Sequence, residues 1–178
     1  MKNLFVIIIP ILLSSFTLFD IESFQIEDGN LIWQKVHQTD LSKNEIINQI
    51  KLSGEFDNIN EIGESVTANI SRKKLDFIEM GESNSSVPIY IVNSDINAFV
   101  LFEFKDDKYR VTVKKIILVQ KSKDAFSEEG EMTNIESFAL KSDNSEIKNS
   151  FTKKPAQIID YTLSKLTKID KADNDKKW

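Results

Sequence analysis

The chain has 178 residues, of which 40% are hydrophobic and 29% are charged, and its formal net charge is −5. The length is typical of one domain, and the composition is typical of a folded chain rather than a disordered one. The acidic balance, without a basic block, argues against nucleic acid as a partner. Cysteine is absent, which excludes disulfides, thiolate metal sites, a cysteine nucleophile and a lipidated cysteine.

Residues 1–19 have the pattern of a secretory signal peptide. Lys2 supplies a short basic region, residues 4–13 are an apolar run, and Ser15-Phe16-Thr17 offers small residues for cleavage. The run is shorter than the ~20 residues that a membrane-spanning helix needs. We therefore expect export to the periplasm or cell envelope, or secretion, with cleavage near residues 15–19. An uncleaved anchor, the one expected contact with a membrane, and a buried core element are the alternatives.

A single α+β domain is expected over residues 20–170, followed by a charged tail at 171–178. Its first residues, 20–29, are a polar lead-in that ends in the turn signal Asp28-Gly29. Residues 31–38 place β-forming side chains on both faces of an extended chain and predict a strand.

The strongest local signal follows this strand. Ser42 and Glu45 have the spacing of a capping box, in which each side chain bonds the backbone N–H of the other residue. Leu41 and Ile46 flank the start of the helix as a hydrophobic staple. Apolar residues at helical spacing then continue to the stop signal Ser53-Gly54. The sequence predicts a helix over residues 43–52.

The rest of the domain alternates as strands until its last helix. From Asp57 to Met80 the pattern predicts β-structure, with one register at residues 59, 61 and 63, a second at 66, 68 and 70, a turn or bulge between them at Gly63-Glu64, and 76–80 as a candidate continuation. Three more strands are predicted over residues 87–92, 96–105 and 108–120. Asp106-Asp107 is the predicted hairpin turn, and a change of phase near Lys114-Lys115 predicts a bulge. Residues 121–131 and 141–150 are predicted loops, 132–140 a short edge strand or an irregular crossing, and an amphipathic helix begins at Pro155. The expected architecture is an antiparallel sheet with one solvated face and two helices on the other.

Two stretches carry a family resemblance. Residues 31–50, LIWQKVHQTDLSKNEIINQI, combine a strand with a capped Ser-Lys-x-Glu helix start. Residues 102–118, FEFKDDKYRVTVKKIIL, are similar to a Lys-Asp-Gly-Lys-Tyr-Arg hairpin, with Asp107 in place of the turn glycine. Both resemble a family of exported bacterial domains of unknown function with a TATA-binding-protein-like (TBP-like) fold. The resemblance implies a curved antiparallel sheet backed by helices, and it implies neither a known activity nor DNA binding.

Few residues suggest chemistry. His37 is the only histidine, and without a cysteine or a second histidine it lacks the partners that zinc sites commonly use. The sequence also has no Gly-x-Ser-x-Gly motif, which a serine hydrolase triad would use. We therefore interpret His37 as a structural residue or one whose ring reaches solvent. Glu128, Glu129 and Glu131 flank Gly130 without the spacing of a calcium loop. The sequence therefore predicts no catalytic, cofactor-binding or metal-binding residues, and no cofactor.

Other residues have two interpretations each. Trp33 and the aromatic strand Phe99–Phe104 could line a ligand pocket, but the core is the preferred interpretation. Tyr109-Arg110 with Lys114-Lys115 form a modest basic patch or a solvated strand face. Asn69 and Asn84 begin glycosylation sequons, which matter only in a eukaryotic secretory pathway.

Two functions remain. The preferred hypothesis is a non-catalytic envelope domain that binds an unidentified protein or small ligand through its open sheet face or edge. The alternative is a small hydrolase or lipid-handling protein with a pocket between sheet and helices, in which His37 or paired carboxylates would have shifted pKa values.

Overall fold

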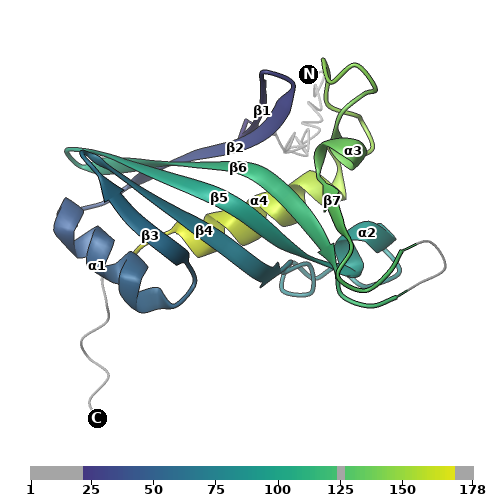
Figure 1. Cartoon of the computed structure of the whole chain (residues 1–178), viewed down its shortest axis with the longest axis horizontal. Coiled ribbons are helices and arrows are strands. Elements are labelled where there is room, and N and C mark those ends of the chain that lie inside the picture. Colours follow the sequence, from purple (N-terminus) through teal and green to yellow (C-terminus); the bar gives the residue numbers. More distant parts are fainter. Residues whose placement is uncertain (1–21, 124–126, 171–178) are drawn as a thin grey trace, which may run out of the picture.

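The computed structural model describes residues 22–123 and 127–170 (Figure 1). The expected signal peptide at 1–19 and charged tail at 171–178 lie outside the described residues. In chain order the elements are β1 (Phe24–Glu27), β2 (Asn30–Gln38), α1 (Lys43–Ser53), β3 (Asp57–Ile62), β4 (Ser65–Lys74), α2 (Ile89–Val92), β5 (Ser94–Lys105), β6 (Lys108–Gln120), β7 (Met132–Asn134), α3 (Glu136–Ala139) and α4 (Lys154–Thr167).

The strands form one seven-stranded sheet in the order β1-β2-β6-β5-β4-β3, and β7 also pairs with β6. Every pairing is antiparallel. The long strand β6 pairs with β2 through its first half and with β7 through its last residues. The expected antiparallel sheet backed by helices is therefore confirmed, and Figure 1 shows α4 lying along the twisted sheet.

One face of the sheet carries the hydrophobic core. Alternate side chains of the central strands point to the side on which α1 and α4 pack, because successive strand residues face opposite ways. The rings of Phe56, just after α1, and Phe102 of β5 meet edge to face at 5.5 Å. The largest fully buried side chains are Trp33, Tyr109, Phe102, Phe151, Leu31, Ile46, Ile50, Ile70, Leu75, Ile91, Ile96 and Ile116.

The predicted helix start at Ser42 is confirmed. Ser42 Oγ accepts a hydrogen bond from the backbone N–H of Glu45, and the Glu45 carboxylate accepts one from the backbone N–H of Ser42 at 2.8 Å. Leu41 and Ile46 are both buried, as the staple predicts. Gly54 ends the helix with a φ of 69°, in the left-handed region that favours glycine.

The β5–β6 hairpin also follows the sequence. Its turn is Asp106-Asp107, and Asp106 has a φ of 43°. The pairing with β5 shifts register between Asn97 and Phe99, opposite the predicted bulge, where Lys115 has a φ of 53°. The bulge lets Tyr109 and Ile116, which have opposite parity along β6, both face the core.

Three expectations were wrong. The polar lead-in contains β1, because residues 24–27 pair with β2 across the Asp28-Gly29 turn. Residues 87–92 contain no strand, because Ile89–Val92 form the one-turn helix α2 directly after Pro88. Residues 76–80 form a turn, in which the N–H of Met80 bonds the carbonyl of Asp76.

Two further expectations were incomplete. Residues 132–140 contain both the short strand β7 and the one-turn helix α3, so the described residues have two short helices besides the two expected ones. The face opposite the core is not uniformly solvated, since Ile32, Thr112 and Val119 on that face are buried. Of the helices in the described ranges, none has both the length and the apolar character to span a membrane.

Candidate functional site

His37 belongs to a row of polar contacts between β2 and α4, which we call the β2–α4 seam. Its imidazole stacks on Tyr109, the directly paired residue of β6, with ring centroids 5.0 Å apart. Its Nε2 lies 3.2 Å from Thr167 Oγ1, whose own proton is donated to the carbonyl of Leu163. His37 therefore donates from Nε2, since a hydroxyl has one proton to give.

Two more β2 residues on the same face complete the β2–α4 seam. Trp33 Nε1 donates to Asp160 Oδ1 at 2.8 Å, and Lys35 Nζ donates to Ser164 Oγ at 2.6 Å. Lys35 Nζ also lies 3.6 Å from Asp160 Oδ2. Alternate residues of a strand share one face, and so do residues three or four apart on a helix. The β2 residues of the seam therefore lie opposite its α4 residues, pair by pair.

The contacts of the β2–α4 seam hold α4 against the sheet. Desolvation by burial, with Lys35 and Lys168 nearby, lowers the pKa of His37 from 6.5 to about 4, so the ring is neutral at neutral pH. Ser164 has the donor Lys35 beside it rather than a base that could take its proton. Among residues 22–123 and 127–170, no three His, Asp or Glu side chains are grouped to hold a metal ion.

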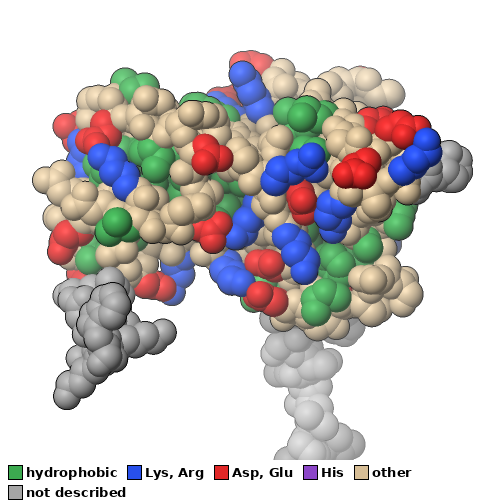
Figure 2. All heavy atoms as spheres, turned by 60° about the horizontal axis from the view of Figure 1, so that its bottom comes forward, with side chains coloured by type: hydrophobic (Ala, Val, Ile, Leu, Met, Phe, Trp, Pro, Cys, Tyr) green, Lys and Arg blue, Asp and Glu red, His purple; other side chains and the backbone are tan. Residues whose placement is uncertain are grey.

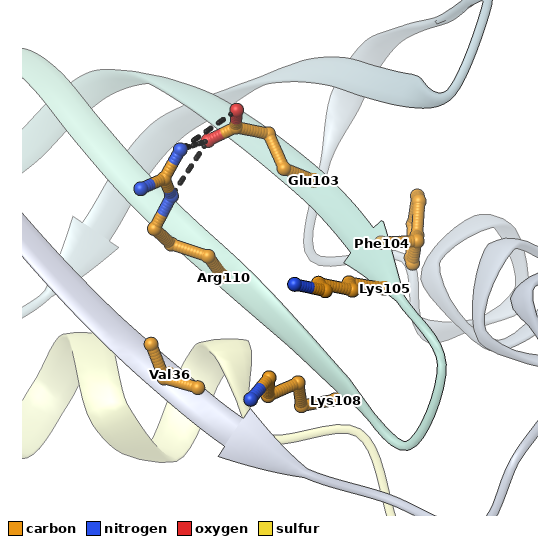
Figure 3. Close-up of a pocket in the computed structure, with 6 residues that line it drawn as sticks. All are labelled: Val36, Glu103, Phe104, Lys105, Lys108 and Arg110. Carbon is orange, nitrogen blue, oxygen red and sulfur yellow. Dashed lines mark hydrogen bonds and ion pairs between the residues drawn. The ribbon is translucent and has the colours of Figure 1, made fainter.

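The opposite face of the sheet has a cavity at the β5–β6 hairpin, which we call the hairpin cavity (Figure 3). It is open to solvent and has a volume of about 350 Å³. Val36, an apolar residue near the end of β2, is 54% exposed. Its lining residues are Val36, Glu103, Phe104, Lys105, Lys108 and Arg110.

The register of three strands brings these side chains together. Arg110 of β6 is paired with both Val36 of β2 and Glu103 of β5, and Lys105 is paired with Lys108. Arg110 binds Glu103 through two hydrogen bonds of 2.9 Å, the fork geometry that arginine forms with a carboxylate. This pair with Glu103 raises the pKa of the Arg110 guanidinium.

The two lysines give the hairpin cavity its charge. Neither Lys105 nor Lys108 forms an ion pair with any residue in the described ranges. Like charges directly opposite each other on a sheet are destabilising. Elsewhere, charges of the two signs lie next to one another, as Figure 2 shows for one face. The hairpin cavity is thus a local positive site on a protein of net charge −5.

The remaining residues singled out from the sequence lie apart from the hairpin cavity. Trp33 and Phe102 are fully buried, which confirms the core interpretation for both. Lys114 ion-pairs with Glu27 of β1 at 2.5 Å, so it does not extend the basic patch around Arg110. In the acidic loop, the Glu131 carboxylate accepts a hydrogen bond from the N–H of Glu128.

The sequence did not indicate Val36, Lys105 and Lys108 as site residues. Lysines beside a turn are an ordinary surface feature, and a valine in an alternating strand predicts a buried position. A signal existed in the parity of β2, since Val36 alternates with Trp33, Lys35 and His37 and so had to face away from them.

A pocket between the sheet and the helices, as the alternative hypothesis requires, is present at the other end of β5 and β6. It has a volume of about 260 Å³. Neither His37 nor a pair of carboxylates lines it, and α2 and α3 cover it rather than α4. The residues lining it are Ile89, Tyr90, Ser94, Leu118, Gln120, Ser127, Glu131, Thr133 and Phe138.

Comparison with known proteins yields structural likenesses alone. No family model matches the chain, and no curated protein matches it significantly. A TBP-like protein from Parabacteroides distasonis is 12% identical, with a TM-score of 0.49 over 80% of this chain and 90% of that one. A DUF4468 family protein from Bacteroides ovatus is 13% identical, with a TM-score of 0.43 over 84% and 93%.

The first of these structures belongs to the TBP-like class that the two sequence stretches resemble. Both similar structures come from uncharacterised bacterial proteins, and at these scores neither likeness carries an argument about function.

Proposed function

We propose that the chain is an exported cell-envelope domain that binds a partner protein, without catalysis, through the hairpin cavity. The observation that carries the proposal is the combination of exposed Val36 with two lysines that form no ion pair with the described residues, all lining one cavity beside the β5–β6 turn. Interfaces combine an apolar centre with a charged rim, and charge complementarity there favours the correct partner. The partner surface we expect is therefore an apolar side chain flanked by carboxylates.

The non-catalytic part of the proposal is supported by the contacts of the seam residues His37 and Lys35. The proton on His37 Nε2 is donated to Thr167, and Lys35 is held by Ser164 and Asp160. The export part of the proposal is supported by the pattern of residues 1–19.

Site-specific photo-crosslinking in the native host tests the binding surface. A photoreactive amino acid replaces Val36 in one chain and Leu52 in another. Leu52 is a suitable control because it is 80% exposed, apolar, and placed on α1 at the core side of the sheet. We expect one discrete protein adduct at position 36 and none at position 52. Adducts of equal yield at both positions, or none at position 36, would contradict the proposal.

A further inference from the structure

The pocket at the far end of the sheet, which we call the end pocket, has a floor of sheet residues and walls of helix residues. Ser94 of β5 pairs with Gln120 of β6. Leu118 of β6 pairs with Ile96 of β5 on one side and with Thr133 of β7 on the other. These pairings place the floor side chains on one face of three neighbouring strands. The end pocket is separate from the hairpin cavity, because Ser94 and Lys105 are the opposite ends of β5.

The walls of the end pocket are aromatic and apolar. The rings of Tyr90, from α2, and Phe138, from α3, are stacked with centroids 4.1 Å apart and planes 10° from parallel. Ile89 stands beside them and is 68% exposed. An exposed isoleucine next to a pair of stacked rings leaves apolar surface that a ligand could remove from water.

Ser94 is the polar group of the end pocket that could hydrogen-bond a ligand. The residue is 2% exposed, and its hydroxyl forms no hydrogen bond with any residue in the described ranges. In the same ranges, no fully enclosed polar side-chain atom lacks a partner. The Ser94 hydroxyl must therefore reach the space of the end pocket. A hydroxyl that faces a pocket and has no protein partner can form a hydrogen bond with a ligand bound there.

The size and charge of the end pocket narrow the ligand class. Its 260 Å³ is below the ~300–1,000 Å³ of sites for drug-sized ligands, so it suits a single ring. Tyr90 is uncharged at neutral pH, and burial raises its pKa further, to about 12. The carboxylate of Glu131, which also lines the end pocket, disfavours an anion.

We propose that the end pocket binds a small uncharged aromatic molecule with one hydrogen-bonding group, placed so that its ring lies against Tyr90 and Phe138 and its polar group meets Ser94. Aromatic rings gain from stacking beyond the area they bury. A site with an unpaired hydroxyl also discriminates against an analogue that cannot bond it. The ligand site is independent of the proposed binding of a partner at the hairpin cavity.

The test compares 4-methylphenol with toluene, which has the same ring and lacks the hydroxyl. Ligand-observed NMR titration of the full chain is expected to show saturable binding of 4-methylphenol, about fivefold tighter than toluene. Ser94→Ala should make the two affinities equal. Absence of saturable binding, equal affinities in the wild type, or a preference retained in Ser94→Ala would overturn the proposal.

A second test fills the end pocket with a larger side chain. Thr133→Phe should abolish binding, whereas Thr67→Phe, a matched change of a half-buried threonine on the opposite face of β4, should leave it unchanged. If Thr133→Phe does not fold, Ile89→Ser is tested instead, because a position that is 68% exposed tolerates the change. This variant removes apolar surface from the pocket and should weaken binding. Wild-type affinity in Thr133→Phe, or in Ile89→Ser when that variant decides, overturns the site.

Discussion

Tyr109→Phe removes one oxygen atom and with it two hydrogen bonds at the end of α4. The Tyr109 hydroxyl donates to the carbonyl of Thr167 at 2.9 Å and accepts from the N–H of Ile169 at 2.7 Å. Tyr109 is 1% exposed and Thr167 is fully buried, so water cannot replace the donor to that carbonyl. A buried polar group left unsatisfied costs about 1–3 kcal/mol. Because Ile169 is half-buried and can reach water, we expect a loss of about 2 kcal/mol.

Urea unfolding followed by circular dichroism measures this loss as a lower midpoint with an unchanged slope. Tyr161→Phe, on the same helix, is the matched control. Its hydroxyl lies 3.5 Å from Glu79 and the residue is 37% exposed, so its loss should stay within about 0.5 kcal/mol. If Tyr109→Phe is no more destabilising than Tyr161→Phe, the hydroxyl does not hold the end of α4.

Three further outcomes follow from the structure and the sequence. Ser42→Ala should destabilise the domain by about 1 kcal/mol in urea, because it removes the N-cap of α1, and an unchanged midpoint would contradict the cap. Unfolded His37 gains a proton near pH 6.5 and folded His37 only near pH 4, so this residue lowers stability as pH falls through that window. His37→Gln should therefore lose less stability than wild type between about pH 7 and about pH 5, and an equal loss would contradict the lowered pKa. Mass spectrometry of the protein from its native host should find a first residue within or just after 15–19, and a chain in the membrane fraction that still begins at Met1 would refute cleavage.

Local rules predicted the elements whose cause lies within a few residues. The capping box at Ser42 and Glu45 satisfies helix N–H groups by itself, and the Asp106-Asp107 turn joins two long alternating strands. The bulge near Lys115 was predictable because a change of parity in a buried strand requires an extra residue.

The misassigned segments are those whose structure depends on contacts with other elements. Residues 24–27 are only four residues long, with two apolar and two polar side chains in alternation, and they become β1 by pairing with the edge of β2. Residues 87–92 have β-forming side chains, but Pro88 and the packing of Ile91 into the core favour one helical turn there.

The candidate sites were the least predictable part of the molecule. The hairpin cavity depends on the pairing of Val36 on β2 with Arg110 on β6, two strands that are far apart in sequence. The end pocket depends on Tyr90 meeting Phe138 across 48 residues, and no local pattern encodes that contact. Nothing in the sequence indicated that Thr167 of α4 is the hydrogen-bond partner of His37.

The central claim is that the hairpin cavity binds a partner through its unpaired positive charge. The most direct measurement is the yield of the Val36 photo-adduct in chains that also carry Lys108→Glu or, as a control of equal charge change, Lys153→Glu. Lys153 is exposed and has no ion pair with the described residues. We predict a loss of about fivefold or more with Lys108→Glu and little change with Lys153→Glu. An unchanged yield with Lys108→Glu, or the same loss with both variants, would contradict the claim.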